Sequence, residues 1–319
     1  MADVAVCVAS HHRPVRLRWL LEALAEQTLP RERFEVIVCH TDGPGSEADV
    51  LLDTHELARA GVLKNVHAEA RFTGAAEKRN RAWKAASAPL IVFTDDDVRP
   101  PPEWLERMVQ ACERNPGAVV QGAVRPDPDE VGLLHAAPHS RTLIIDPPHP
   151  YGECANIAYP RELLERLGGF DEREPPLQGG EDTDLAQRAI REGAPYVGAP
   201  EAVTWHAVTT GGLLARLRSI PRWTTLAYVA AEHPHMRRHM FLRLFWRPSH
   251  AALLPALYGL MRRRPLLVVP WALMTAPRYG SSPRGIARSL SELPSRLAIE
   301  VVELVTAIRG AIRYRTPFL

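Results

Sequence analysis

Cysteine is scarce in this sequence. The four cysteines, Cys7, Cys39, Cys112 and Cys154, lie far apart and form no CxxC pair. This spacing argues against a cysteine-bound metal and against a disulfide framework. Since Cys7 and Cys39 fall within apolar runs, we expect both to be small buried core residues in a reducing compartment.

The sequence shows neither a secretory signal nor an apolar run of bilayer length. The residues after Asp3 pass directly into a β-rich run, without the basic and apolar regions of a signal peptide. Two apolar runs near the C-terminus, residues 251–261 and 266–276, are each eleven residues long, whereas a spanning helix needs roughly 20. We therefore expect a cytoplasmic protein whose C-terminal part lies on a membrane rather than crossing it.

Lysine is missing from residues 211–319, although this segment contains seventeen arginines and only four acidic residues. Its net charge is therefore +13, and because the whole chain carries +2, residues 1–210 carry −11. An acidic N-terminal part suits a divalent metal site. An arginine- and leucine-rich C-terminal part suits an anionic membrane surface or a polyanion.

The composition changes after Gly211 and Gly212, where we place the domain boundary. We expect an α/β domain over residues 1–210 and a basic amphipathic helical tail over residues 211–319. Leucine and aromatic residues alternate with the arginines of the tail, which is typical of helices that bind a membrane interface. The alternative is a helical domain or a dimer interface with a solvated basic face.

The N-terminal part alternates short β-rich runs with helical stretches. This pattern is typical of a sheet covered by helices, so the predicted fold class is α/β with a C-terminal helical extension. The expected strands span residues 4–9, 34–39, 62–67, 90–94, 118–125, 153–158 and 202–205. The expected helices span residues 15–27, 47–60, 75–86, 103–115, 161–167 and 182–192.

Polar side chains directly follow three of these strands. Ser10 and Arg13 follow the first strand, Asp42 follows the second, and three aspartates at residues 95–97 follow the fourth. In such sheets ligands bind at the carboxyl ends of the strands. We therefore expect these segments to form one site.

The most specific of these segments is the row of three carboxylates, Asp95, Asp96 and Asp97. Their mutual repulsion favours a bound cation. Mg²⁺ and Mn²⁺ bind one or two protein carboxylates and keep positions for phosphate oxygens, so this cluster suits a nucleoside diphosphate. The alternative is a turn that caps the helix beginning near Pro102.

A second acidic cluster, Glu181, Asp182 and Asp184, stands at the start of an expected helix. Acidic residues in a first helical turn are favoured by the helix dipole, so capping alone explains them as well. The motif GGFDE at residues 168–172 precedes the cluster, and His206 follows it at the end of the last expected strand.

The segment GAAEKRNRA at residues 74–82, followed by a strand and the aspartates at residues 95–97, resembles the core of family 2 glycosyltransferases. The resemblance covers about residues 3–210. It implies the GT-A fold, in which a DxD motif binds the metal ion of a sugar nucleotide. Asp95 and Asp97 take the two DxD positions, with Asp97 as the more direct metal ligand, and His206 is implied to complete the coordination.

The same resemblance implies contacts with the donor nucleotide. Residues 10–13, with the sequence SHHR, stand where the family usually has Thr-Tyr-Asn-Arg. Asp42 stands at the position of a uracil-contacting acid, Arg79 would approach the diphosphate, and Asp96 belongs to the same donor site. Apart from the resemblance, Asp42 with Gly43 is also an ordinary turn pair, and Arg79 is also an exposed arginine on a polar helix face.

Residues 168–206 resemble the acceptor half of these enzymes. The resemblance implies that Asp182 is the catalytic base, with Glu181 and Asp184 as supporting acids, and that Asn156 lies in the sugar pocket. Sugar transfer with inversion requires a base for the acceptor hydroxyl on one side and stabilisation of the departing diphosphate on the other. Two separate acidic clusters meet that requirement.

We therefore expect an inverting glycosyltransferase that uses Mg²⁺ or Mn²⁺ and a UDP- or GDP-linked sugar. The expected acceptor is a hydroxyl of a cell-envelope glycan or a lipid-linked intermediate. The basic tail would hold the enzyme on anionic lipid at the inner face of the cytoplasmic membrane.

Two alternatives remain open on the sequence alone. A sugar-phosphate nucleotidyltransferase also combines such a sheet with metal-binding carboxylates, but it normally begins with a glycine-rich phosphate loop, and no glycine lies between Val4 and Pro14. A non-catalytic membrane-bound scaffold, or a nucleic-acid binder that uses the tail, is the other alternative. The negative charge of residues 1–210 would repel a phosphate backbone, so we expect no nucleic-acid partner.

Overall fold

The computed structural model describes residues 2–69, 74–172, 179–277 and 279–319. The chain divides into two compact units. The first comprises Met1–Val131 and Thr142–Val208, and the second comprises Gly132–Arg141 and Thr209–Leu319. The change in composition near residue 210 gave no indication that Gly132–Arg141 groups with the second unit.

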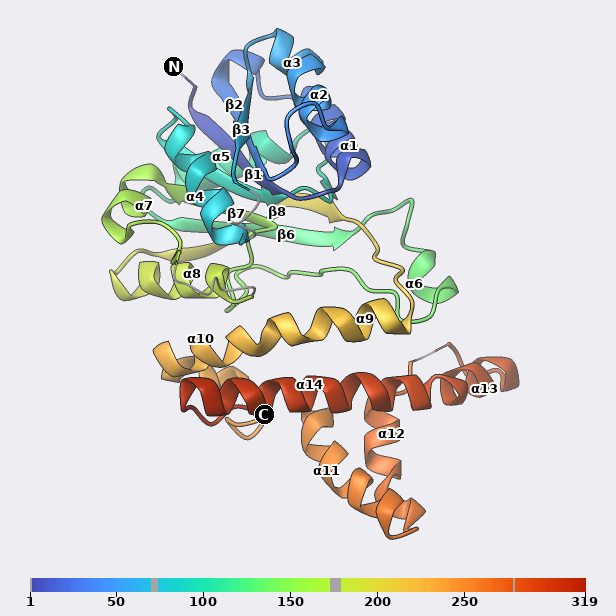
Figure 1. Cartoon of the computed structure of the whole chain (residues 1–319). Helices are drawn as coiled ribbons and strands as arrows, with labels where there is room; N and C mark the ends of the chain where they lie inside the picture. Colours follow the sequence, from blue (N-terminus) through green and yellow to red (C-terminus); the bar gives the residue numbers. More distant parts are fainter. Residues whose placement is uncertain (1, 70–73, 173–178, 278) are drawn as a thin grey trace. The chain divides into compact units, whose positions relative to one another are not determined.

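Eight strands of the described chain form one mixed sheet in the first unit (Figure 1). The spatial order is β3-β2-β1-β4-β7-β6-β8-β5. β3, β2, β1 and β4 run parallel, whereas β7 is antiparallel to both β4 and β6. The strands are β1 (Val4–Ser10), β2 (Phe34–His40), β3 (Leu63–His67), β4 (Leu90–Asp95), β5 (Val98–Arg99), β6 (Val119–Pro126), β7 (Asn156–Pro160) and β8 (Tyr196–His206).

Helices cover both faces of this sheet, so the predicted α/β architecture is confirmed. One face packs against α1 (Pro14–Ala25), α2 (Glu47–Thr54), α3 (Glu56–Arg59) and α5 (Trp104–Arg114). The other face packs against α4 (Ala75–Ala85), α7 (Arg161–Leu167) and α8 (Glu181–Arg191). Burial on both faces explains why the central strands are apolar throughout, and Cys7 and Cys39 lie in this core as predicted.

Two element predictions need correction. The predicted helix over residues 47–60 is two helices, because His55 has an extended backbone with φ −63° and ψ 152°. The His55 ring then caps α3 by accepting a hydrogen bond from the backbone N–H of Leu57. The predicted strand over residues 202–205 is the last part of the longer strand β8, which begins at Tyr196.

The assignment of Asn156 to the sugar pocket is wrong. The Asn156 side chain is fully buried, and its Nδ2 donates hydrogen bonds to the carbonyl oxygens of Ala123 at 2.8 Å and Ala202 at 2.7 Å. Its Oδ1 accepts a hydrogen bond from Trp104 Nε1 at 2.9 Å. These bonds hold the irregularity where the register of β6 and β8 shifts between Gly122 and Ala123. Asn156 is therefore a structural residue.

The second unit is helical, which confirms the predicted C-terminal extension. Its longest helix is α14 (Leu293–Tyr314). The other helices of this unit include α6 (Leu133–Ala136), α9 (Leu213–Ser219), α10 (Leu226–Glu232), α11 (Pro248–Met261), α12 (Val269–Thr275) and α13 (Pro283–Ser291). Short 3₁₀ segments connect them, including η4 (Pro265–Leu267). Within the described residues, no helix combines the length and apolar character required to cross a bilayer.

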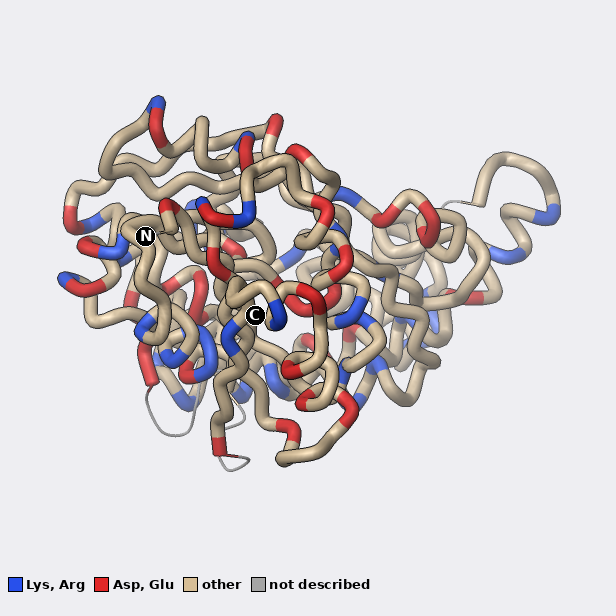
Figure 2. The backbone as a smooth tube through the Cα atoms, turned by 90° about the horizontal axis from the view of Figure 1, so that it is seen from above, with Lys and Arg blue, Asp and Glu red and all other residues tan. Residues whose placement is uncertain are grey.

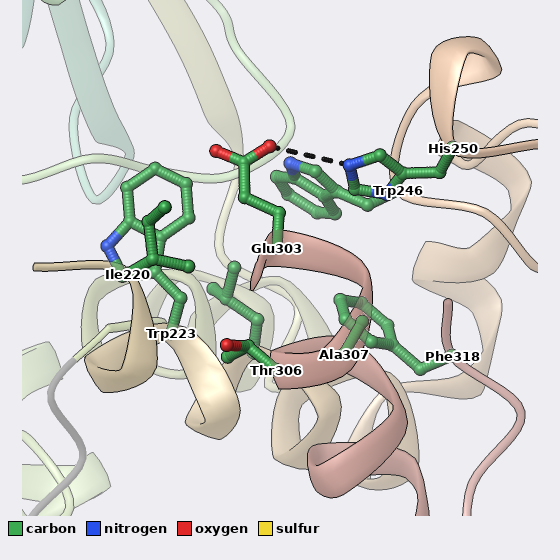
Figure 3. A pocket seen from close by; sticks show the side chains of 9 residues that line it. Ile220, Trp223, Trp246, His250, Glu303, Thr306, Ala307 and Phe318 are labelled. Atoms are coloured by element: carbon green, nitrogen blue, oxygen red, sulfur yellow. Dashed lines mark hydrogen bonds and ion pairs between the residues drawn. The ribbon is translucent and has the colours of Figure 1, made fainter. Parts of the chain in front are cut away.

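Part of the positive charge of this unit is used inside it. Figure 2 marks the basic and acidic positions along the backbone. Glu303 on α14 is buried and forms ion pairs with Arg216 at 2.8 Å and with Arg247 at 3.5 Å. A small pocket beside it is lined by aromatic rings, and His250 Nε2 lies 3.4 Å from Glu303 (Figure 3). Burial opposes ionisation, but His250 and the two arginines lower the pKa of Glu303 below its ordinary value.

Gly122 provides a test of the packing around Asn156. A Cβ atom at this position would lie 2.3 Å from Asn156 Nδ2 and 2.4 Å from the Ala202 carbonyl oxygen. We expect Gly122→Ala to lower the free energy of unfolding by about 1–3 kcal/mol, measured by urea denaturation, because backbone and side chain must both shift. Gly43→Ala is the matched control, since no atom lies within 4 Å of a Cβ there. Equal stabilities of the two variants would contradict this packing.

Candidate active site

The carboxyl ends of three parallel strands bring the predicted donor residues together. The register pairs Ser10 of β1 with His40 of β2, and Ala9 of β1 with Asp95 of β4. The loops that carry Arg13 and Asp42 therefore start at the same edge of the sheet as the row of aspartates. The sheet positions these polar groups by pairing strands whose apolar residues are buried in the core.

Asp96 ties the loop after β1 to the end of β4. The carboxylate is buried and accepts hydrogen bonds from Ser10 Oγ at 2.8 Å, from the His11 N–H at 3.3 Å and from Arg13 Nη1 at 3.1 Å. Burial raises the pKa of Asp96 to about 6, against the opposing charge of Arg13. Both oxygens of Asp96 therefore have partners within the chain. Its predicted contact with a nucleotide stays a prediction.

Asp95, Asp97 and His206 form a set of possible metal ligands. One ligand atom from each of the three residues lies within 4.8 Å of the others, and His206 Nε2 is 3.4 Å from Asp97 Oδ1. The backbone sets this arrangement, because β5 pairs Val98 with His206 and the Ala207 N–H donates to the Asp97 carbonyl at 2.9 Å. Two carboxylates and one imidazole are donors that suit Mn²⁺ and Mg²⁺ sites.

The tautomer of His206 also suits a metal ligand. His206 Nδ1 lies 2.9 Å from the carbonyl oxygen of Ala207, and a carbonyl only accepts hydrogen bonds. Nδ1 therefore carries the proton, which leaves the Nε2 lone pair on the side of Asp97. A backbone partner of this kind is the usual way in which proteins orient a metal-binding histidine.

Arg13 neutralises part of this acidic cluster. Its Nη1 lies 2.6 Å from Asp97 Oδ2 and 3.1 Å from Asp96 Oδ1, and its side chain is half exposed. The guanidinium thus occupies the side of Asp97 away from the Oδ1 atom that faces His206. Arg13, which is predicted to contact the donor nucleotide, therefore lies next to Asp97 of the possible metal-ligand set.

Arg79 joins the two acidic clusters. The side chain is buried on α4, and its Nη2 contacts Asp95 Oδ1 at 2.9 Å while its Nη1 contacts Glu181 Oε1 at 3.0 Å. The alternative of an exposed surface arginine is therefore wrong. The helix pattern of the sequence predicted the position of Arg79 but gave no indication of either partner.

Asp182 stands in the first turn of α8, after Gly180, whose φ of +92° favours glycine. Its Oδ1 accepts a hydrogen bond from the Thr183 N–H at 2.8 Å. Burial raises the pKa of Asp182 well above its ordinary value, and Glu181 raises it further, whereas Arg79 opposes the shift. A carboxylate with a raised pKa is a better proton acceptor than an ordinary surface aspartate.

Asp184 has a partner on its own helix, and its predicted role as a supporting acid stays a prediction. It is buried and forms an ion pair with Arg188 at 2.8 Å, one turn further along α8. Arg188 also donates to the carbonyl oxygens of Leu167 at 2.9 Å and Gly169 at 2.7 Å. Asp184 therefore helps to fix the start of α8 against the preceding loop.

Asp42 is paired with His12, a residue that the sequence did not single out by itself. His12 Nδ1 contacts Asp42 Oδ1, and the His12 N–H lies 3.4 Å from Asp42 Oδ2. Burial would raise the pKa of Asp42, but the hydrogen bonds from His12 lower it below its ordinary value. His12 has a φ of +53°, which is unusual for a residue with a side chain. The departure of residues 10–13 from the family pattern was the only signal in the sequence.

Lys78 is a second residue that the sequence did not reveal. The side chain is buried, and its Nζ donates a hydrogen bond to the carbonyl oxygen of Ser10 at 2.9 Å. Lys78 precedes Arg79 on α4, so this helix supplies one cation to the loop after β1 and one to the acidic clusters. A buried lysine on a helix cannot be told from a surface lysine by sequence pattern alone.

Comparisons with known proteins find glycosyltransferases among the relatives of this chain. The sequence profile described as glycosyl transferase family 2 matches residues 5–168. A validoxylamine A glucosyltransferase from Streptomyces hygroscopicus subsp. jinggangensis is 26% identical over 231 residues, which cover 62% of this chain and 54% of that protein. An uncharacterized glycosyltransferase from Haemophilus influenzae is 31% identical over 204 residues, which cover 59% of this chain and 62% of that protein. The chain thus spans about half of the first relative.

Solved structures show the same fold. A mannosyltransferase from Pyrobaculum calidifontis, in complex with GDP-Man and Mn²⁺, has a TM-score of 0.60 at 20% identity and covers 97% of this chain and 86% of its own. Residues 1–349 of S. aureus TarS, in complex with UDP, have a TM-score of 0.53 at 14% identity and cover 99% and 92%. The predicted GT-A fold is confirmed. Because the family profile matches more than half of the sequence, this chain belongs to glycosyl transferase family 2.

Proposed function

We propose that this chain transfers a sugar from a nucleoside-diphosphate donor to an acceptor hydroxyl, with inversion and with the help of a divalent metal ion. One observation carries the proposal. Buried Arg79 forms ion pairs with Asp95, a member of the possible metal-ligand set, and with Glu181. Glu181 directly precedes Asp182, whose pKa is raised. Family membership favours sugar transfer over the alternative of a nucleotidyltransferase.

The donor side of the site uses Asp95, Asp97 and His206 to hold Mg²⁺ or Mn²⁺. When bound, such an ion stabilises the negative charge of a departing diphosphate. Arg13 and Lys78 add positive charge near the loop after β1, where the phosphates of the donor would lie. The structural neighbours that bind GDP-Man with Mn²⁺ and UDP support a GDP- or UDP-linked donor.

The acceptor side uses Asp182 as the general base. Its carboxylate accepts the proton of the acceptor hydroxyl while that oxygen forms a bond to the anomeric carbon and the bond to the diphosphate breaks. Glu181 is held by Arg79 and keeps negative charge beside Asp182. Burial and this like charge together raise the pKa of Asp182, which makes it a better proton acceptor.

Asp42 and His12 form the proposed base-contacting pair. Since Asp42 is ionised and already contacts His12, it offers its remaining acceptor capacity to N–H groups of a nucleobase. Arg79 contributes by positioning: its two ion pairs fix the orientation of Asp95 and Glu181. We no longer expect it to reach a diphosphate without giving up one of these partners.

The second unit supports a proposal of membrane binding. α11 and α12 project side by side from α14 (Figure 1), and the connection between them contains Arg262, Arg263 and Arg264. Several apolar side chains of this hairpin are exposed: Leu254, Leu260, Met261, Leu266, Leu273 and Met274. Leu266 is 82% exposed and Leu273 is 74% exposed. Apolar groups beside exposed arginines suit the headgroup region of an anionic membrane.

We therefore propose a peripheral enzyme at the inner face of the cytoplasmic membrane, with an acceptor drawn from cell-envelope glycans or lipid-linked intermediates. Lys and Arg side chains near a membrane surface each contribute about 1 kcal/mol of attraction to anionic lipid. The three adjacent arginines and the apolar hairpin act together, because neither a short apolar segment nor a small basic patch alone gives stable attachment.

Asp97→Ala tests the metal site. With Mn²⁺ present, we expect the variant to lose roughly 100-fold or more of the hydrolysis or transfer of UDP- and GDP-linked sugars, since metal stabilisation is worth several kcal/mol. Asp146→Ala is the control, because this carboxylate is 84% exposed and lies outside the cluster. The screen measures nucleotide release for a set of donors. Unchanged metal-dependent activity in Asp97→Ala would contradict the proposal.

Asp182→Asn tests the base. We expect kcat to fall by about 10²–10⁴ while the KM for the donor changes little, because the variant keeps the shape but cannot accept the proton. Glu192→Gln, an exposed acid just after α8, should behave like the wild type.

The pH profile of the wild type gives a second measurement on Asp182. A base must be deprotonated, so kcat/KM should fall as the pH is lowered through the raised pKa of this group. The acid limb should therefore lie well above the ordinary aspartate value of about 3.9. A profile that stays flat down to that value would show that Asp182 is not the base.

Vesicle sedimentation tests the hairpin. The double variant Leu266→Glu and Leu273→Glu should lose most of its binding to vesicles that contain phosphatidylserine, since two charges replace apolar contacts. Val50→Glu, on the first unit, is the control because Val50 is also exposed, at 51%. If both proteins sediment with vesicles equally, the hairpin is not the membrane contact.

A further inference from the structure

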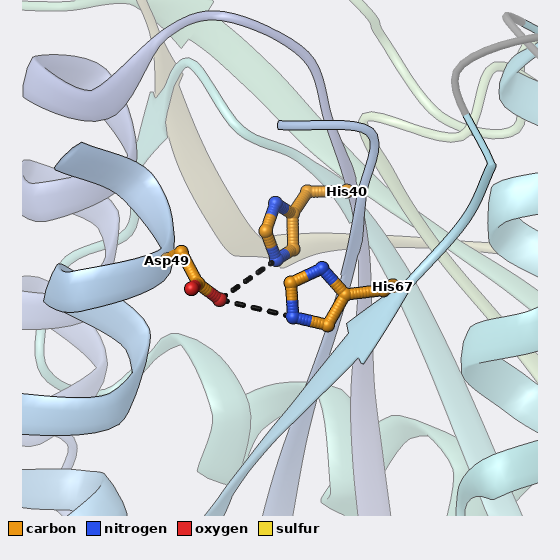
Figure 4. Close-up of side chains that lie close together, drawn as sticks. All are labelled: His40, Asp49 and His67. Atoms are coloured by element: carbon orange, nitrogen blue, oxygen red, sulfur yellow. Dashed lines mark ion pairs between the residues drawn. The ribbon is translucent and has the colours of Figure 1, made fainter. Parts of the chain in front are cut away.

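A second group of metal-binding side chains lies outside the site described above. His40 ends β2, His67 ends the neighbouring strand β3, and Asp49 faces them from α2 (Figure 4). Asp49 Oδ1 is 2.9 Å from His67 Nε2 and 3.9 Å from His40 Nε2. One ligand atom from each of the three residues lies within 4.8 Å of the others.

Asn65 determines the tautomer of His40. The amide nitrogen of Asn65 donates to Asp49 Oδ1 at 2.9 Å and to Asp53 Oδ1 at 3.0 Å, so its two carboxylate partners fix which atom is the nitrogen. The amide oxygen therefore faces His40 Nε2, at 2.8 Å. Since an amide oxygen only accepts, His40 Nε2 carries the proton in the metal-free protein.

This tautomer leaves the other nitrogen of His40 in an unfavourable position. His40 is fully buried, and its Nδ1 has no hydrogen-bond partner. The carboxylate oxygen Asp42 Oδ2 lies 3.7 Å from this Nδ1 atom. A lone pair thus faces an anion inside the protein, although buried polar atoms normally have partners.

We propose that His40, Asp49 and His67 bind a Zn²⁺ ion through His40 Nε2, His67 Nε2 and Asp49 Oδ1. Zinc bonds of 2.0–2.2 Å place neighbouring tetrahedral ligands about 3.3 Å apart. The observed separations of 2.9 and 3.9 Å from Asp49 Oδ1 lie on either side of this value. Shifts of a few tenths of an ångström therefore convert the hydrogen-bonded cluster into a ligand set.

The surroundings of the three side chains suit this role. The second oxygen of Asp49 accepts a hydrogen bond from the Gly45 N–H at 2.7 Å, which orients the carboxylate as in other metal sites. Burial lowers the pKa of His40, so its ring is neutral and available as a ligand. His67 is 45% exposed, which gives an ion access from solvent, and the Asn65 amide oxygen or water is available for the fourth position.

Zinc binding would also remove the unfavourable contact of His40. With Nε2 bound to the ion, the ring proton moves to Nδ1 and becomes a donor directed toward Asp42. Asp42 is the proposed base-contacting residue, so the second site lies one side chain away from the donor nucleotide site. The Zn²⁺ proposal itself rests only on the cluster and does not depend on the proposed sugar transfer.

Zinc competition with a chromophoric chelator tests the site on the full chain. We expect Asp97→Ala, which lacks a ligand of the proposed catalytic metal site, to retain one Zn²⁺ site of the wild type with similar affinity, because the second site does not use Asp97. His67→Ala and Asp49→Asn should each weaken this binding by roughly 100-fold or more, since losing a residue that only hydrogen-bonds to a metal ligand already costs 10–100-fold. His149→Ala, which removes a histidine paired with Glu153, should leave it unchanged.

Two results would overturn the proposal. One is binding that survives in His67→Ala and Asp49→Asn but disappears in Asp97→Ala, which would place the ion at the aspartate cluster. The other is no Zn²⁺ binding by the wild type. Thermal unfolding of the metal-free variants distinguishes a loss of binding from a loss of fold. We expect His67→Ala to keep the fold, because the side chain that it removes is half exposed.

Nitrogen-15 NMR of histidine-labelled protein provides a readout independent of affinity. Without metal, His40 should carry its proton on Nε2, as the Asn65 contact requires. With one equivalent of Zn²⁺, the proton should appear on Nδ1. A His40 ring whose tautomer does not respond to Zn²⁺ would contradict direct coordination even if the ion binds elsewhere.

Discussion

The ion pairs of one buried arginine, Arg79, connect the two acidic clusters of the proposed active site. Asp95 and Glu181 come from distant parts of the sequence, and the side chain of Glu181 is buried whereas that of Asp95 is 30% exposed. Arg79 lies between them and pairs with each, at 2.9 and 3.0 Å. Without it, the buried carboxylate of Glu181 would lose this ion pair, and breaking a buried pair is far more costly than the pair itself is stabilising. The guanidinium of Arg79 thereby offsets the repulsion between the two acidic clusters, and Arg13 offsets part of the charge of Asp96 and Asp97.

The sheet topology explains how the ligand set is assembled. β4 ends at Asp95, and the chain then forms the short strand β5, which pairs with the end of β8. Backbone hydrogen bonds of this pairing, rather than side-chain contacts, place Asp97 beside His206. Asp96, between them, points its carboxylate into the protein and anchors the loop after β1. Three successive aspartates thus have three different environments, and only the outer two share a ligand set with His206.

The sequence allowed the sheet, its covering helices and the two acidic clusters to be predicted, since apolar strands that end in carboxylates are visible in one dimension. It did not reveal which partners the buried polar residues choose. Asn156 is predicted to lie in a pocket, whereas its amide satisfies three buried groups, one each on α5, β6 and β8. His40 and His67 belong to neighbouring strands, and their proximity depends on strand register, which a single sequence does not fix. The contact of His12 with Asp42 was not predictable from the sequence either, because it depends on a left-handed backbone conformation at His12.

The projecting pair α11 and α12 affects how the purified protein behaves. Its outward leucines and methionines form a surface that water does not favour, and surfaces of this kind tend to associate with one another. The adjacent arginines repel each other most strongly in dilute buffer, because salt screens exposed charges. Raising the ionic strength should therefore promote self-association of the free protein, while detergent micelles that cover the apolar tips should keep it monodisperse.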